Sequence, residues 1–197
     1  MNKESLRKWY LEEFLSVSEI ARKTCVSHNK INYWLSKYKI PKRSISEAVY
    51  LRYNPSGDPF TFKLPKTNSE WQLFGLGIGL FWGEGNKRNK SSIRLGNTDP
   101  KLIRSYMMFL NKIYGINKDK LKFGLQIFSD VSPMIAQRFW IKELNVKKSQ
   151  FQKIIITPSR GIGNYKHKSQ YGVLTVYFNN TKLKKIFDSL IENFPLL

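Results

Sequence analysis

The chain has 197 residues, of which 41% are hydrophobic and 14% aromatic, and this composition excludes a wholly disordered protein. It carries 34 Lys and Arg against 14 Asp and Glu, and the formal charge of +20 indicates a polyanionic partner, for which nucleic acid is the obvious choice. Solubility alone, or an organism with a lysine-rich proteome, explains a few such charges better than it explains this excess. Residues 1–48 hold ten basic and five acidic side chains and residues 86–197 hold twenty-one and six, so both ends are basic.

Cysteine content and apolar runs bear on the compartment. Cys25 is the single cysteine, which excludes an internal disulfide and a zinc site of several cysteines. The most apolar run, residues 73–82, is about half of the roughly 20 residues that a membrane span requires. No apolar leader opens the chain, so we expect no membrane segment and a reducing, cytoplasmic location, near the nucleoid of a bacterium, phage host or organelle.

The first 25 residues predict two short helices. Leu6, Tyr10 and Phe14 recur every four positions, which predicts a helix over residues 4–15 with these side chains on one face. A second helix is expected over residues 18–23. The hydroxyl of Ser16 or Ser18 can cap it, because a hydroxyl satisfies backbone N–H groups that are unpaired at a helix start.

A third helix follows Ser27, its expected cap, and should bury Ile31, Trp34 and Leu35. Together with small Ala21 and a turn at residues 24–26, this spacing is that of a helix-turn-helix, although cysteine stands at a turn position where glycine is common. Such modules insert the third helix into the major groove of DNA. The expected DNA contacts, with Asn29, Lys30 and Asn32 as base readers, are Ser27, His28, Asn29, Lys30, Asn32, Tyr33, Lys37 and Arg43. A three-helix bundle that binds protein is the alternative.

Turn-forming residues end this module. Pro41 removes a backbone donor and disfavours helix in the residue before it. Residues 53–68 hold three further prolines and a glycine without a helical period. We therefore predict a helix-turn-helix domain at residues 1–48, a linker at 49–68 with a short bridging helix over 46–52, and a second domain at 69–197.

Residues 71–85 are apolar on every side, yet glycine recurs at positions 75, 79 and 83. A helix of this kind, capped by Ser69, is expected to be wholly buried. Each internal glycine costs about 1 kcal/mol relative to alanine, so a stripe of three indicates close contact with a second helix. Glu84 is expected to emerge where the helix ends at Gly85. The residues alone favour an ordinary core helix with a solvated Glu84, since one carboxylate does not define a site.

Residues 77–85, with Gly79-Leu80 and Gly83-Glu84-Gly85, resemble the signature of the LAGLIDADG homing endonuclease family. Residues 93–100 also resemble that family's strand entering its second helix. The resemblance spans roughly residues 69–194, and its specific part is short. Trp82 stands where the family usually carries a small or acidic residue, and the segment between Glu84 and Ile93 is short for a full hairpin.

The resemblance implies a metal site and a homodimer. In the family, two such helices pack through their small residues, which here are Gly75, Gly79 and Gly83, and the acidic residue at the position of Glu84 binds a divalent metal. The single motif implies that two chains form one enzyme. Two Glu84 carboxylates near a two-fold axis would repel each other, and Mg²⁺ would relieve this repulsion, polarise a scissile phosphate and activate water.

The remaining elements predict an α+β domain. A strand over residues 92–97 precedes a helix that begins at Pro100 and ends at Gly115. Residues 121–127 alternate apolar and polar side chains, as in a strand with one buried face. A helix over residues 132–144 with Ile135, Phe139 and Leu144 inward, strands over 151–157 and 171–179, and a helix over 181–194 complete the order.

A mixed or antiparallel sheet with helices on one face leaves its other face free, and basic side chains there would form a saddle for duplex DNA. The expected contacts are Lys120, Lys122 and Gln126, with Arg160 and Lys166 from the glycine-rich loop 159–169. Lys153 or Lys168 is expected to supply positive charge near a metal-bound phosphate, as a catalytic group. Any one of these lysines by itself is more simply a solvated surface charge.

Three hypotheses of function follow. The first is sequence-specific binding of double-stranded DNA with Mg²⁺-dependent cleavage by a homodimer. The second is a transcriptional or structural DNA-binding protein on the same scaffold that does not cut. The third is an accessory protein of a recombinase or transposase, which only the helix-turn-helix suggests.

Overall fold

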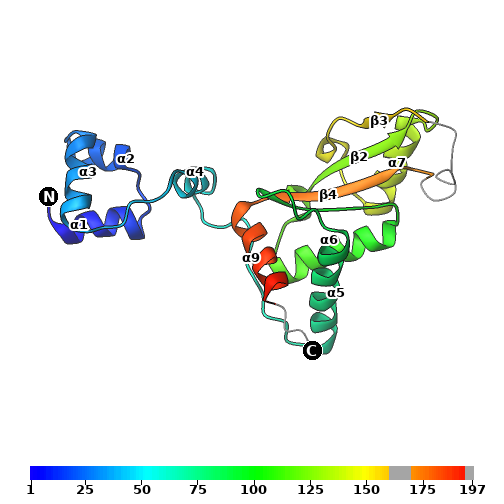
Figure 1. Ribbon diagram of the computed structural model, residues 1–197, viewed down its shortest axis with the longest axis horizontal. Coiled ribbons are helices and arrows are strands. Elements are labelled where there is room, and N and C mark those ends of the chain that lie inside the picture. Colours follow the sequence, from blue (N-terminus) through cyan, green and yellow to red (C-terminus); the bar gives the residue numbers. More distant parts are fainter. Residues whose placement is uncertain (160–169, 194–197) are drawn as a thin grey trace. The chain divides into compact units, whose positions relative to one another are not determined.

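The structure is a computed structural model that describes residues 1–159 and 170–193. The chain forms two compact units, Met1–Pro59 and Phe60–Leu197, shown in Figure 1. The described residues form eight α-helices and one mixed four-stranded sheet, which confirms the α+β class. None of those helices combines the length and apolarity of a membrane span.

The first unit packs three helices around one apolar cluster. These are α1 (Lys3–Arg7), which continues into a π-helical turn η1 (Lys8–Glu12), α2 (Val17–Thr24) and α3 (His28–Lys37). Ser16, and not Ser18, caps α2 in a reciprocal capping box with Glu19, and the Ser27 hydroxyl accepts from the backbone N–H of Lys30 at 3.3 Å. The core consists of Leu6, Tyr10, Ile20, Ala21, Ile31, Leu35 and Ile40.

The expected single helix over residues 4–15 was wrong in its second half. The helical stretch ends in a π-helical turn at Glu12, so Phe14 lies beyond it and not on the face that carries Leu6 and Tyr10. Phe14 therefore lies 56% exposed, with a left-handed backbone at φ +55°. Trp34, expected to be buried on α3, is half-buried.

Cys25 forms the turn between α2 and α3 in the left-handed conformation, at φ +54° and ψ +36°. Its N–H donates to the carbonyl of Arg22 at 3.4 Å, and the N–H of Val26 donates to that of Ala21 at 3.1 Å. The turn thus keeps the conformation for which glycine is common, and the cysteine side chain costs about 1 kcal/mol there.

The bridging helix expected over residues 46–52 is present as α4 (Ile45–Tyr53). Ser44 and Glu47 cap it reciprocally, and none of its residues is buried. Ile45, Val49 and Tyr53 recur every four positions and lie 86%, 46% and 79% exposed.

The second unit begins with an extended segment, residues 60–66, that closes the end of helix α6 (Pro100–Tyr114). The N–H of Thr61 donates to the carbonyl of Tyr114 at 2.9 Å, and the N–H of Lys63 donates to that of Ile113 at 2.7 Å. These bonds satisfy carbonyls that a helix end leaves unpaired. Helix α6 begins after Asp99 and ends at Gly115 (φ +60°), as expected.

Helix α5 (Asn68–Glu84) carries the glycine stripe. Thr67 caps it through a box with Glu70, so the expected Ser69 cap was wrong. The expectation of complete burial was also wrong, because the exposed fractions of Trp71, Leu76 and Trp82 are 50%, 48% and 43%. Buried contact is made by the opposite face, where a Cβ atom on Gly77 would lie 2.1 Å from the ring of Phe109.

The sheet has the order β1 (Ser92–Asn97), β4 (Val173–Asn179), β2 (Lys122–Phe128), β3 (Ile155–Thr157). Strand β4 pairs antiparallel with β1 and β2, while β2 and β3 are parallel. The parallel pair arises because α7 (Pro133–Leu144) crosses between them. The strand expected over residues 151–157 is shorter, since Phe151 forms only an isolated bridge with Phe123.

Side chains alternate between the two faces of the sheet. Ile93 and Leu95 of β1, Phe123 and Leu125 of β2, and their neighbours on β4 are buried against α5, α6 and α9 (Thr181–Glu192), which Figure 1 shows on one side of the sheet. The opposite, open face carries Arg94, Gly96, Lys122, Gly124, Gln126, Thr175 and Tyr177.

Helix α7 packs on the core through Leu144 and half-buried Phe139, as expected, but not through Ile135. Ile135 is 59% exposed, while Ala136 and Trp140 are buried along with Leu144. The indole N–H of Trp140 donates to the carbonyl of Tyr171 at 2.9 Å. Two short 3-10 turns, η2 (Lys118–Lys120) and η3 (Lys148–Gln150), complete the described chain.

Candidate nucleic-acid interface

In the first unit, α3 presents a polar and basic outer face. Asn29, Tyr33 and Lys37 lie four residues apart opposite the buried Ile31 and Leu35, and all three are exposed. The Lys37 amine lies 5.8 Å from the centre of the Tyr33 ring, so cation and ring form one local surface. His28 and Lys30 are also exposed, whereas Asn32 is half-buried and Ser27 serves as the helix cap.

Arg43, expected to contact DNA, has internal partners instead. Its guanidinium donates to the carbonyls of Phe14 (2.9 Å) and Leu15 and lies over the Tyr10 ring at 4.1 Å. Its backbone N–H also donates to the Tyr10 hydroxyl at 3.0 Å. These contacts fix the chain where it leaves the bundle, which gives Arg43 a structural role.

In the second unit, Glu84 is the last residue of α5 and is exposed. Directly after it, Gly85 forms an antiparallel bridge with Leu95 of β1, and the N–H of Asn86 donates to the carbonyl of Arg94 at 2.9 Å. The carboxylate-bearing end of α5 is therefore tied to the edge strand of the sheet.

The segment between Glu84 and β1 is a basic loop that sequence reasoning missed. Lys87, Arg88 and Lys90 are all exposed in it. Asn89 holds the loop together, because its side-chain oxygen accepts from the backbone N–H groups of Ser91 (2.9 Å) and Ser92 (2.8 Å). Three cations within six residues of Glu84 are the signal in the sequence that points to this loop.

Arg94 lies on the open face in a row with Tyr177 and Lys122. Tyr177 of β4 pairs with Arg94 on one side and with Lys122 on the other. The Arg94 guanidinium lies over the Tyr177 ring at 5.3 Å, and its Nε donates to the Ser92 hydroxyl at 2.7 Å. Burial raises the pKa of the Tyr177 hydroxyl, and the Arg94 charge offsets part of this rise.

Of the other expected sheet contacts, Gln126 lies exposed on the open face and donates to the Thr157 hydroxyl at 3.1 Å. Lys120 is exposed in η2, just before β2 rather than within it. Lys153 lies just before β3, and β1 and β3 are opposite edges of the sheet, about 14 Å apart at the usual strand spacing. It is therefore not a neighbour of Glu84 within one chain. Arg160, Lys166 and Lys168 lie outside the described residues.

The structure bears on the expected magnesium site only through the residues it describes. Among the described residues, no group of three or more His, Cys, Asp or Glu side chains is arranged to hold a metal ion. Mg²⁺ is commonly held by one or two carboxylates together with substrate phosphates and water. Glu84 supplies one carboxylate, so a second chain and a bound phosphate would have to supply the rest.

The glycine stripe of α5 faces open space in the single chain. A Cβ atom on Gly75, Gly79 or Gly83 would meet nothing within 4 Å. Gly77 differs, because the core of its own chain packs against it and leaves no room for a side chain. Space is therefore available along the stripe for a second helix.

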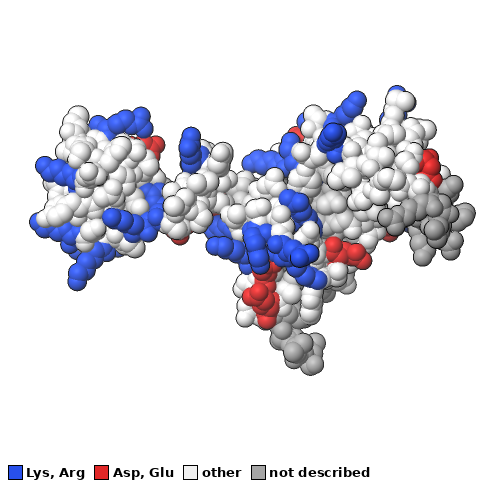
Figure 2. Space-filling model, turned by 45° about the horizontal axis from the view of Figure 1, so that its top comes forward, with Lys and Arg blue, Asp and Glu red and all other residues white. Residues whose placement is uncertain are grey.

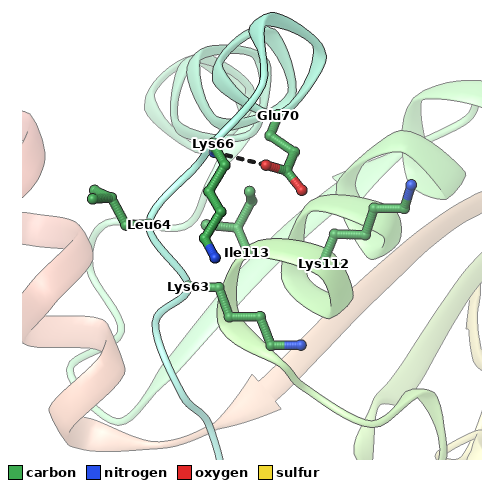
Figure 3. A pocket seen from close by; sticks show the side chains of 6 residues that line it. All are labelled: Lys63, Leu64, Lys66, Glu70, Lys112 and Ile113. Atoms are coloured by element: carbon green, nitrogen blue, oxygen red, sulfur yellow. Dashed lines mark hydrogen bonds between the residues drawn. The ribbon is translucent and has the colours of Figure 1, made fainter.

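At the other end of α5, about 21 Å from Glu84 at the helical rise, lies a hollow of about 420 Å³. Figure 3 shows Lys63, Lys66 and Lys112 around it. The Glu70 carboxylate there accepts from the N–H groups of Lys66 (2.7 Å) and Thr67 (3.3 Å). The Lys66 bond is the main cause of its lowered pKa.

Basic side chains are spread over the visible face of each unit in Figure 2, with acidic ones at only a few places. Comparisons of this chain with protein-family models, with curated proteins and with solved structures found no match.

Proposed function

We propose that this protein binds double-stranded DNA and cleaves it with a divalent metal ion, as a homodimer joined through α5. The single observation that carries the proposal is the end of α5, where exposed Glu84 stands between an open glycine stripe and an open, basic sheet face. The resemblance of residues 77–85 to the LAGLIDADG signature supports the same assignment for Glu84.

The sheet face supports binding of a duplex backbone. Arg94 and Lys122 lie on it, and Lys87, Arg88 and Lys90 lie at its edge. Phosphate contacts from such side chains supply most of the affinity in sequence-independent binding. Gly96 and Gly124 flank Thr175 on neighbouring strands. Few side chains therefore protrude from the centre of the face, and a duplex could approach the sheet closely there.

For the first unit we propose a helix-turn-helix that places α3 in the major groove. Exposed Asn29 and Lys30 near the start of the helix are suited to base edges, and Lys37 is suited to a phosphate. This unit would add sequence-specific contacts to those of the sheet.

In the proposed reaction a Mg²⁺ ion would polarise the scissile phosphate and generate the attacking hydroxide. This chain would contribute Glu84 as a metal ligand, and the second chain would contribute its own Glu84. The basic residues around the helix end would draw in the anionic substrate and balance its charge.

A DNA-binding protein that does not cut is the second candidate. It is favoured by the lack, among the described residues, of any group of three or more His, Cys, Asp or Glu side chains that could hold a metal ion, and by the exposed cations Lys87, Arg88 and Lys90 that follow Glu84. Cleavage requires that dimerisation supply the second carboxylate.

Incubation of the purified protein with plasmid or genomic DNA and Mg²⁺ or Mn²⁺ tests the proposal. We expect cleavage by the unmodified protein and its loss in Glu84→Gln, with DNA binding retained. Glu192→Gln is the matched control, because Glu192 is likewise the exposed last residue of a helix. Binding without cleavage under either metal would select the second candidate.

A further inference from the structure

Arg94 is the cation most firmly held beside Glu84. The bridge between Gly85 and Leu95 places Arg94 opposite Asn86, two positions after Glu84 in the chain. Leu95 points into the core, so Arg94, its neighbour on the strand, points to the open face. It is half-buried, while the loop cations Lys87, Arg88 and Lys90 are exposed.

Neighbouring residues fix the orientation of its guanidinium. The Ser92 hydroxyl accepts from Nε at 2.7 Å and itself donates to the Asn89 side-chain oxygen at 2.9 Å. The backbone N–H of Asn89 in turn donates to the side-chain oxygen of Asn86 at 3.1 Å. The guanidinium carbon lies over the Tyr177 ring, 5.3 Å from its centre.

These contacts leave the outer edge of the guanidinium available. Among the described residues, its two Nη groups have no hydrogen-bond acceptor and no carboxylate partner. A planar fork held in advance loses little conformational entropy when it binds two oxygens of a phosphate. Lys122 lies on the other side of Tyr177 and supplies a second cation one strand spacing beyond the ring.

We propose that Arg94 grips the backbone phosphate that lies beside Glu84, with Ser92 and Tyr177 positioning its guanidinium and Lys122 holding the adjacent stretch of backbone. The inference rests on the proposed DNA binding. It gives Arg94 the task that the sequence assigned to Lys153 or Lys168, namely positive charge at the phosphate that is cut.

The test measures duplex affinity as a function of salt concentration, with a 30-base-pair oligonucleotide in Ca²⁺, for the full chain and its variants. Each phosphate contact contributes about −0.9 to the slope of log K against log salt, so removing one contact makes the slope shallower by about 0.9. We expect this change in Arg94→Met and Arg94→Gln. The matched control Arg138→Met removes an exposed arginine of α7 and should leave the slope unchanged.

Positioning is tested by rescue. Arg94→Lys restores the charge without the planar fork, so it should recover the salt slope. With Mg²⁺ and saturating protein, we expect a single-turnover cleavage rate at least about tenfold below that of the unmodified protein. Ser92→Ala retains Arg94, and we expect it to slow cleavage while the slope is kept.

The outcomes separate this inference from the proposed function. If Arg94→Met and Arg94→Gln, with unchanged melting curves, have the same slope as Arg138→Met, the phosphate contact of Arg94 is refuted whether or not the protein cuts. If the slopes change but no divalent metal supports cleavage, the nuclease proposal fails and the contact stands. Absence of any duplex binding by the unmodified protein overturns both.

Discussion

At the residue scale, the environment of each polar group decides what it contributes. Tyr106 and Tyr114 of α6 are fully buried, and their hydroxyls have no hydrogen-bond partner among the described residues. Burial raises the pKa of both hydroxyls. Each unpaired buried hydroxyl lowers the free energy of unfolding, because its hydrogen bonds to water are lost without replacement.

Tyr106→Phe should therefore leave the free energy of unfolding unchanged or raise it by up to about 1 kcal/mol. The melting temperature should stay the same or rise accordingly. The advantage should grow above pH 10. There the unfolded Tyr106 loses its proton while the folded one, with its raised pKa, keeps it, so the unmodified protein loses stability through this hydroxyl and the variant does not. Thermal melts of both proteins between pH 7 and pH 11 measure this, and a clear destabilisation at pH 7 would reveal a partner for the hydroxyl.

Glu70 predicts the opposite pH dependence. Its folded pKa lies below the usual carboxyl value of 4.5, so its stabilisation of the start of α5 is complete above that value and is lost as the pH falls through the lower folded pKa. Glu70→Gln should melt earlier than the unmodified protein at pH 7, and the two curves should converge in acid. Melting temperatures from pH 7 down to pH 3 provide the check, and a constant difference over this range would contradict it.

At the element scale, glycines on opposite faces of α5 have opposite roles. A side chain on Gly77 would collide with Phe109, whereas one on Gly79 would enter open space. Substitutions at Gly77 therefore test packing within the chain, and substitutions at Gly79 test packing between chains.

Gly77→Ala should destabilise the single chain by about 1–3 kcal/mol, because it forces the core to shift. Gly79→Ala should stabilise an isolated chain by about 1 kcal/mol through helix propensity, yet weaken self-association if α5 meets its twin. Urea denaturation gives the first quantity and sedimentation velocity the second. Unchanged association of Gly79→Ala would argue against the glycine stripe as the interface.

Sequence reasoning succeeded where a local rule decides the structure. The Ser27 cap, the Pro100 start and Gly115 end of α6, and the alternation along β2 each follow from a few adjacent residues. It failed where a distant or unusual contact decides. The π-helical turn moved Phe14 off its face, and apolar residues around α5 could not reveal which side packs within the chain.

The same distinction holds for the candidate site. Glu84 could be proposed from the sequence because it stands in a short motif, and Lys122 and Gln126 because they alternate with apolar residues along a strand. Arg94 was missed because its position beside Glu84 depends on the bridge between Gly85 and Leu95, which no spacing in the sequence encodes. The internal partners of Arg43 could not be foreseen, because its acceptors, the carbonyls of Phe14 and Leu15, become available only where the first helix ends.

At the scale of the whole molecule, the charge of +20 would dominate the proposed association with nucleic acid. Both units are basic, so each can release counterions from a duplex. Such binding depends on salt far more than on base sequence.

Affinity for a random duplex should fall by about a thousandfold or more between 50 mM and 200 mM salt if six or more phosphates are neutralised. The slope should be shallower for a single strand of equal length, since its counterions are less condensed. Fluorescence anisotropy titrations over this range measure both slopes. A nearly flat dependence for the duplex would mean that the charge serves another purpose.

The extended segment at residues 60–66 has a mechanical consequence. It enters the second unit by bonding Thr61 and Lys63 to the last carbonyls of α6, before the chain reaches α5. Tension applied through the first unit, as when that unit is anchored and the second is pulled, is therefore borne first by these two bonds and by buried Phe60. Helix α5, with Glu84 at its far end, comes under tension only after the hydrogen bonds of Thr61 and Lys63 have broken.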